Sequence, residues 1–231
     1  MGKNTIKEVP LSVVMLGASG AVGSQVLRSL VAYPQIGSIT SLGRRAIPKF
    51  STEKVHQKII DVFDPKSYLE LLPGHDVAIC TLGVGQPSKM GKDEFVKIDK
   101  LAVIDFAKAC KKAGIRHFQL LGSVGANPNS SSFYLRSKGE LAKALQAVDF
   151  DRLSIFQPSM IITPNNRYGF LQGIMLRVWP LLSPLLLGGL RKYRGIPVAS
   201  LGKAIAKNVL INNKGFETLH WNKIRELAEG M

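Results

Sequence analysis

Short apolar runs alternate with amphipathic stretches along most of this chain. Residues 11–16 form a nearly all-apolar run that ends at a glycine, as central strands of parallel sheets do. Residues 21–31 follow with apolar side chains at helical spacing. This alternation predicts a Rossmann-like α/β fold, in which a doubly wound, mostly parallel sheet has helices on both faces. The same pattern predicts further strands at 36–42, 55–60, 76–82, 117–121 and 153–157, and helices at 94–113 and 134–148.

The chain has 231 residues, which is enough for one packed α/β domain and short for two. No stretch has the composition of a linker, so we predict a single NAD(P)-binding domain over residues 1–231. The pattern changes after Pro158, where a turn-rich segment leads into an apolar stretch broken by two prolines. We assign residues 159–200 to a small, hydrophobic substrate-side region, and expect residues 157–168 and the apolar stretch to select the substrate.

The apolar stretch has two interpretations. It carries Arg177 as well as the prolines, which argues against a membrane-spanning helix. It can form a wall of the substrate pocket or an interface of a homo-oligomer. Alternatively, residues 170–194, which end in the basic sequence RKYR, can make a peripheral contact with a membrane surface.

The charge balance is strongly basic. Lysine and arginine total 31 against 16 acidic residues, a formal net charge of +15, which attracts phosphates, anionic lipid or nucleic acid. The basic residues are spread over many segments, without an aromatic RNA-binding pattern or a recognition helix. We therefore predict no specific nucleic-acid binding.

The cysteines and histidines predict neither a disulfide nor a metal site. Cys80 and Cys110 lie in apolar or helical segments without CxxC spacing, and the four histidines are far apart in the sequence. Two unpaired cysteines fit a reducing compartment. We therefore expect a cytoplasmic location, peripheral to a membrane if the apolar region contacts lipid.

Three glycines fall between the first strand and the first helix. In an open parallel sheet, this turn is where a dinucleotide pyrophosphate binds. Glycines there permit a tight turn, let phosphates approach the N–H groups at the helix start, and let the helix pack closely on the strand. The motif predicts a dinucleotide site whose turn consists of Gly17, Ala18, Ser19, Gly20, Ala21, Val22 and Gly23.

The end of the second strand indicates which dinucleotide binds. An acidic residue there would hydrogen-bond the ribose hydroxyls of NAD. This chain instead has Arg44 and Arg45, which can pair with the 2′-phosphate of NADP. We therefore predict NADP(H) as the preferred cofactor, with NAD(H) as the alternative. The ends of the third and fourth strands are expected to complete the site, with Asp61 and Val62 at the adenine and Thr81, Leu82 and Gly83 along the cleft.

Three polar residues form a candidate catalytic group. Ser123 lies at the carboxyl end of the fifth strand, and Tyr134 and Lys138 are four residues apart on one face of the next helix. A tyrosine hydroxyl beside a lysine can donate or accept a proton, and a serine hydroxyl can hydrogen-bond a substrate oxygen. Each residue type alone is common, so their joint placement carries the prediction.

The order of these motifs resembles that of the short-chain dehydrogenase/reductase superfamily. GASG, SLGRR, GHDVAICTLG, RHFQLLGSVGA, FYLRSKGELAKAL and FDRLSIFQPSM are similar to its atypical branch of Tat-interacting-protein-like oxidoreductases, through about Ser159. The resemblance implies NAD(P) binding and a Ser123, Tyr134 and Lys138 site in which the lysine also binds the nicotinamide ribose. We place Pro158 among the cofactor-contacting residues.

Two positions depart from the pattern of the wider superfamily. Asp99 lies in the predicted helix 94–113 where many relatives have asparagine, and Gln157 precedes Pro158 where arginine is frequent. The first departure concerns the proton relay, and the second concerns the substrate-side loop.

Two functions of different classes follow. The first is an NADP-dependent oxidoreductase that transfers hydride to or from a small, hydrophobic carbonyl compound, alcohol or quinone. The second is an NADPH-binding regulatory or scaffold protein that binds a protein partner or a membrane surface without turnover. The intact catalytic group favours the enzyme, because a sensor has no chemical need for it.

Overall fold

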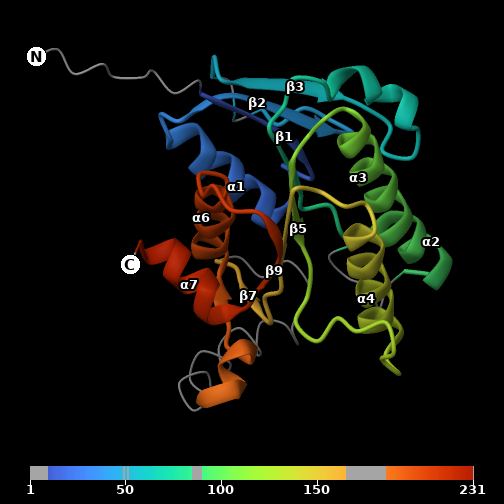
Figure 1. Ribbon diagram of the computed structural model, residues 1–231, viewed down its shortest axis with the longest axis vertical. Coiled ribbons are helices and arrows are strands. Elements are labelled where there is room, and N and C mark those ends of the chain that lie inside the picture. The colour runs from blue at the N-terminus through green and yellow to red at the C-terminus, as the bar shows by residue number, and fades with distance from the viewer. Residues whose placement is uncertain (1–9, 49, 51, 85–89, 165–185, 231) are drawn as a thin grey trace, which may run out of the picture.

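The computed structural model describes residues 10–48, 50, 52–84, 90–164 and 186–230. Within these residues, parallel strands form a seven-stranded sheet in the order β3-β2-β1-β4-β5-β6-β9 (Figure 1). The predicted α/β fold with a mostly parallel sheet is therefore confirmed. The strands are β1 Leu11–Leu16, β2 Ile36–Gly43, β3 Val55–Ile59, β4 Val77–Cys80, β5 His117–Leu121, β6 Arg152–Phe156 and β9 Gly215–Leu219.

Helices cover both faces of the sheet because successive strand residues point to opposite sides. Val13 and Met15 of β1 pack with α1 (Ala21–Ala32), α6 (Val198–Asn208) and α7 (Trp221–Glu229). Val14 and Leu16 pack instead with α3 (Ala102–Lys112) and α4 (Phe133–Gln146). Figure 1 shows these two groups of helices on opposite sides of the sheet. The nearly all-apolar sequence of β1 is thus explained by the burial of both of its faces.

The strand order reverses beside β1. The chain runs outward from β1 to β2 and β3, then returns to place β4 on the other side of β1. The carboxyl ends of β1 and β4 are therefore neighbours at the point where ligands bind in such sheets.

The structure corrects two predicted boundaries. The predicted helix 94–113 consists of α2 (Lys92–Val96), a π-helical segment at Lys97–Leu101 and α3. The predicted strand 76–82 is shorter, because only Val77–Cys80 belongs to the ladder. The next three residues leave the sheet and line a pocket near β1.

The C-terminal part adds elements that the apolar pattern did not predict. These are α6, β9 and α7, and β9 extends the sheet as an edge strand beside β6. Of the proposed substrate-side region 159–200, residues 165–185 lie outside the described residues. The described remainder contains a two-stranded sheet of β7 (Ile161–Ile162) and β8 (Ile196–Pro197) and a 3-10 segment at Gly188–Tyr193. Short 3-10 segments also occur at Pro65–Ser67 and Leu69–Leu71.

No helix in the described part of the chain has the length and the apolar character that crossing a membrane requires.

Candidate functional site

The glycine turn connects β1 to α1 and approaches the end of β4. Gly17 has φ +92°, a left-handed conformation that side chains disfavour, and a Cβ built there would lie 2.6 Å from the backbone N of Leu82. Gly23 is also crowded, since its Cβ would lie 2.2 Å from the carbonyl oxygen of Gly17. The fold itself therefore requires glycine at both positions.

Gly20 differs from the other two glycines. It precedes α1 as its N-cap with φ −72°, and among the described residues its Cβ would meet only the Gly17 oxygen, at 3.3 Å. Because Gly20 has no side chain, no side-chain hydrogen bond caps the start of α1, and the first turn of this helix contains no acidic residue. Its bare backbone fits the approach of a phosphate to the helix start.

The turn residues divide between the core and the pocket. Ala18 and Val22 are buried in the core with α6, so their side chains face away from the cleft. Ala21 also packs against this core. Ser19 and Gly20 line the pocket. A ligand there would meet this turn through its backbone and the Ser19 side chain.

A pocket of about 170 Å³ runs from this turn to the end of β2. It brings together most of the residues predicted for the adenosine side of a dinucleotide, although they come from four strand ends. The lining residues are Leu16, Gly17, Ser19, Gly20, Ser41, Leu42, Gly43, Arg44, Arg45, Ile47, Ile60, Val62, Thr81, Leu82 and Gly83.

The two arginines are exposed, and neither forms an ion pair with another described residue. Their loop is held by Gln57 of β3. The Gln57 Oε1 accepts a hydrogen bond from the Ile47 N–H at 2.6 Å, and its Nε2 donates to the carbonyls of Ile47 and Phe50, each at 3.1 Å. Sequence reasoning missed Gln57, for which the only local signal is a polar residue in a short strand.

Asp61 and Val62 have different surroundings. Val62 is buried and lines the pocket. Asp61 is not among the lining residues, and its Oδ1 accepts a hydrogen bond from the Phe63 N–H at 2.9 Å. The predicted adenine contact of Asp61 therefore has less structural support than that of Val62, and both stay predictions.

The candidate catalytic residues lie at the carboxyl edge of the sheet. Ser123 follows β5, and Tyr134 and Lys138 lie in the first two turns of α4. The Lys138 Nζ lies 6.0 Å from the centroid of the Tyr134 ring, and Phe95 packs against that ring at a centroid distance of 5.8 Å. The structure thus brings the tyrosine and the lysine together against an aromatic support.

Ser123 and Pro158 are joined through the backbone. The Val124 N–H donates to the carbonyl of Pro158 at 3.0 Å, and the Ser123 hydroxyl makes a long contact of 3.4 Å with the Val124 carbonyl. Pro158 therefore lies beside the loop that carries Ser123. The serine hydroxyl is only weakly engaged within the protein, which leaves it able to bind a substrate oxygen.

Lys138 forms a buried ion pair with Asp99. The lysine Nζ and the Asp99 Oδ1 are 2.5 Å apart, and the two side chains are 7% and 2% exposed. In the sequence, Asp99 stands out only as a departure from the asparagine that many members of the wider superfamily have there. The contact joins residues from two helices, so no local spacing indicates it.

Both cysteines, Cys80 and Cys110, are free and buried. Cys80 ends β4 beside the site. Burial raises the pKa of its thiol to about 12. Because the thiolate is the reactive form, Cys80 is not a nucleophile at neutral pH.

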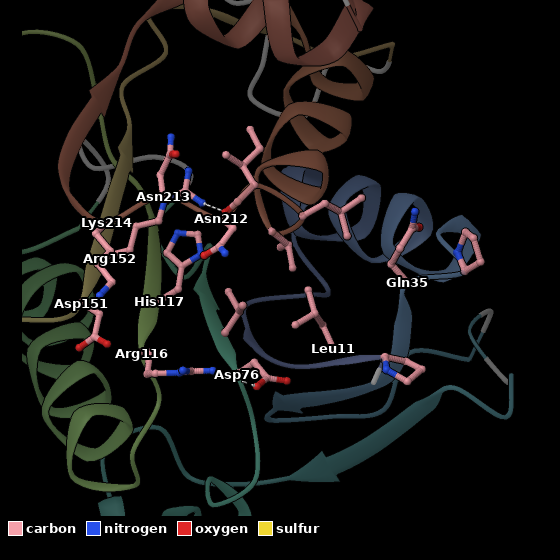
Figure 2. A pocket seen from close by; sticks show the side chains of 16 residues that line it. Leu11, Gln35, Asp76, Arg116, His117, Asp151, Arg152, Asn212, Asn213 and Lys214 are labelled. Carbon is pink, nitrogen blue, oxygen red and sulfur yellow. Dashed lines mark hydrogen bonds and ion pairs between the residues drawn. The ribbon is translucent and has the colours of Figure 1, made fainter. Parts of the chain in front are cut away.

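A second cavity, of about 850 Å³, lies at the opposite, amino-terminal edge of the sheet (Figure 2). His117 and Arg152 line its inner wall, and both are buried. His117 Nε2 hydrogen-bonds to Ser154 Oγ at 3.0 Å, and Arg152 pairs with Glu217 of β9 at 2.6 Å. None of the described residues that line this cavity is a predicted site residue.

Comparison with known proteins places the chain among nucleotide-binding proteins. A family model described as NAD(P)H-binding matches residues 17–171. The chain is 37% identical over 154 residues to Protein HTATIP2 of Rattus norvegicus, covering 65% of this chain and 63% of that protein. It is 32% identical over 169 residues to Protein FMP52, mitochondrial, of Meyerozyma guilliermondii, covering 71% of this chain and 72% of that protein. The chain thus spans less than two thirds of the length of the rat relative.

A solved structure has the same fold. MoeE5 in complex with UDP-glucuronic acid and NAD superposes with a TM-score of 0.70 at 16% identity, covering 90% of this chain and 75% of that chain. The matched family region begins at the glycine turn and extends past the helix that carries Tyr134 and Lys138. The chain therefore belongs to the NAD(P)H-binding family, and its fold is the Rossmann-like α/β fold with a parallel sheet.

Proposed function

We propose that this protein is an NADP(H)-dependent oxidoreductase that reduces a small hydrophobic carbonyl compound or quinone, or oxidises the matching alcohol. The observation that carries the proposal is the packing of Tyr134 beside Lys138 at the same sheet edge as the glycine-turn pocket. A protein that only sensed the cofactor would not need a proton donor there. The apolar sequence of the substrate-side region supports a hydrophobic substrate.

The preference for NADP(H) rests on Arg44 and Arg45. Both line the pocket at the end of β2, and no ion pair with a described residue occupies either guanidinium. A guanidinium can donate two parallel hydrogen bonds to a phosphate. NAD lacks this phosphate, so the pair would discriminate between the two cofactors.

The side chains would supply orientation and a proton. When bound, the nicotinamide cofactor supplies or accepts the hydride. The Tyr134 hydroxyl would donate a proton to the substrate oxygen in reduction and accept it in oxidation. The Ser123 hydroxyl would hydrogen-bond that oxygen where charge develops, and Lys138 would bind the nicotinamide ribose.

Titration of the nucleotide-free protein with NADPH and NADH by calorimetry, at one salt concentration, tests the cofactor assignment. We expect tighter binding of NADPH. In the double variant Arg44→Ala/Arg45→Ala, NADPH affinity should fall tenfold or more, because each charge-assisted hydrogen bond contributes about 1.5–3 kcal/mol. NADH affinity should be nearly unchanged. An equal loss for both cofactors would contradict a role in phosphate recognition.

Turnover separates the enzyme from the regulatory alternative. Wild-type protein should oxidise NADPH with a member of a panel of hydrophobic carbonyl compounds and quinones. Tyr134→Phe should bind NADPH as wild type does and lose that activity. Tight NADPH binding without turnover on the panel, or equal rates in wild type and variant, would favour an NADPH-binding regulatory or scaffold protein.

We also propose a peripheral contact with an anionic membrane through part of residues 170–194. Residues 170–185 lie outside the described residues, but Leu187 and Leu190 beyond them are 63% and 54% exposed and adjoin Arg191 and Lys192. Apolar side chains beside basic ones fit a lipid headgroup region. Wild-type protein should float with phosphatidylserine liposomes, and Leu187→Ser/Leu190→Ser should float less. Wild-type protein that stays unbound would end this proposal.

The expected cytoplasmic location stays a prediction. The name of the fungal relative places that relative in mitochondria instead. Homo-oligomer formation through the apolar region likewise stays a proposal, and analytical ultracentrifugation tests it.

A further inference from the structure

Asp99 connects two sides of the proposed nicotinamide site. Its Oδ1 accepts a hydrogen bond from Lys138 Nζ at 2.5 Å, and its Oδ2 accepts one from the backbone N–H of Val84 at 2.7 Å. Lys138 belongs to α4, whereas Val84 directly follows the strand-end residues 81–83 that line the pocket. One carboxylate therefore links the candidate ribose-binding lysine to residues 81–84, which follow β4.

The surroundings of this carboxylate fix the position of the lysine. Asp99 and Lys138 are almost fully buried, and the Phe95 ring lies 6.0 Å from the lysine Nζ. A buried ammonium group is costly unless a counter-charge and hydrogen bonds compensate it. Asp99 supplies both, so Lys138 does not have the conformational freedom of a surface lysine.

The two donors explain why a carboxylate is present at this position. Each oxygen of Asp99 faces a donor, one from Lys138 and one from Val84. Asparagine has one acceptor oxygen and an NH₂ group that only donates. It would therefore satisfy one partner and present an N–H to the other. The strand end is also close, since a Cβ at Gly83 would lie 3.2 Å from the Asp99 Oδ1.

We propose that Asp99 is a positioning residue for the nicotinamide half of the cofactor. It holds Lys138 for the ribose hydroxyls and, through the backbone N–H of Val84, fixes the end of residues 81–84. This inference rests on the proposed function, because Lys138 has the assigned role only if a nicotinamide cofactor binds. The adenosine half, assigned to the glycine turn and to Arg44 and Arg45, does not depend on Asp99.

The variant Asp99→Asn tests this separation of the two halves. NADPH and adenosine 2′,5′-bisphosphate, which contains only the adenosine half of NADP, are titrated into wild type and variant by calorimetry. We expect NADPH affinity to fall about tenfold, the size of one charge-assisted hydrogen bond, and the affinity for the bisphosphate to change by less than about twofold. Asp105→Asn is the matched control, because it makes the same chemical change at an exposed position of α3.

A double variant tests whether Asp99 acts through Lys138. Asp99→Asn/Lys138→Met removes both buried charges, so neither is left unpaired. If Asp99 acts mainly by holding Lys138, the double variant should bind NADPH within about threefold of Asp99→Asn, since residues that act together are not additive. Thermal unfolding of each variant shows whether it is folded under the titration conditions.

The outcomes separate this inference from the proposed function. An unchanged NADPH affinity in a folded Asp99→Asn variant would overturn the positioning role alone. An equal loss for NADPH and the bisphosphate would also overturn it, because that result indicates a general structural effect. A wild-type protein that binds neither ligand would overturn the proposed function and this inference with it.

Discussion

Gly23→Ala is expected to lower the free energy of unfolding by about 3 kcal/mol, the upper end of the usual range for overpacked interiors. The new Cβ would lie 2.2 Å from the carbonyl oxygen of Gly17, 2.7 Å from Thr81 Oγ1 and 2.9 Å from the Cα of Ala18. Two of these obstacles are backbone atoms, which cannot rotate away. Either α1 must move away from the end of β1, or the turn must open. Urea unfolding followed by circular dichroism measures the loss.

Gly20→Ala and Gly91→Ala are the matched variants. Gly20 precedes α1 with φ −72°, and Gly91 precedes α2 with φ −62°, so both backbones accept alanine. Among the described residues, a Cβ at Gly91 would have no atom within 4 Å, and one at Gly20 would meet a single atom at 3.3 Å. Both variants should lose less than about 1 kcal/mol of stability, as expected for glycine-to-alanine changes at an N-cap.

Cofactor binding then distinguishes Gly20 from Gly91. If a pyrophosphate lies against the turn, a methyl group at Gly20 stands between it and the helix start. Gly20→Ala should therefore weaken NADPH binding in a stable protein, whereas Gly91→Ala should not. A Gly23→Ala protein as stable as wild type would contradict the packing argument. A Gly20→Ala protein with wild-type NADPH affinity would contradict the pyrophosphate assignment.

Acidification is expected to destabilise the folded protein through His117. Burial, together with the charge of Arg152, lowers the pKa of His117 to about 3 from an ordinary value of 6.5. The unfolded chain therefore binds a proton that the folded chain excludes. The stability contribution is fully present above pH 6.5 and is lost as the pH falls from 6.5 toward 3, by about 1.4 kcal/mol for each pH unit. Between pH 6.5 and 4.5, the loss in the free energy of unfolding caused by His117 amounts to about 2–3 kcal/mol.

The variant His117→Gln isolates this contribution. Glutamine can still hydrogen-bond to Ser154 but does not titrate, so the stability of the variant should fall less between pH 7.5 and pH 4.5 than that of wild type. His56→Gln is the control, because it makes the same change at an exposed position of β3. Urea unfolding at both pH values provides the comparison. Equal losses in wild type and His117→Gln would show that other groups cause the acid sensitivity.

The structural setting of His117 was not visible in the sequence. Arg152 makes hydrogen bonds to Glu217, to the carbonyls of Asn208 and Ile211, and to the Asn208 side chain. Ser154 donates to the same Glu217 oxygen at 2.6 Å, because the β6–β9 register places these two residues opposite each other. β9 was not predicted, so its partners could not be predicted either. A five-residue edge strand with a largely exposed burial pattern gives little periodic signal.

The candidate catalytic residues likewise include some that the sequence predicts and some that it does not. Ser123, Tyr134 and Lys138 could be predicted because they lie on consecutive elements at recognisable spacing. Asp99 lies 39 residues before Lys138 in the chain. Gln57 of β3 contacts Ile47 and Phe50, which lie 10 and 7 residues before it in the loop after β2. Both partners were absent from the predicted site. Their roles depend on how helices and loops are placed, which local patterns do not encode.

The sequence by itself determined the α/β class, the strand-to-helix turn at Gly17–Gly23 and the arginines that follow β2. These features depend on burial periodicity and on backbone conformations that are specified within a few residues. The tertiary structure alone decided that Gly17 and Gly23 are required by packing and Gly20 is not, that Asp99 holds Lys138, and that Arg152 meets Glu217. The physical reason is that these contacts join residues distant in the chain, so strand order, register and helix placement must be established before the side chains meet.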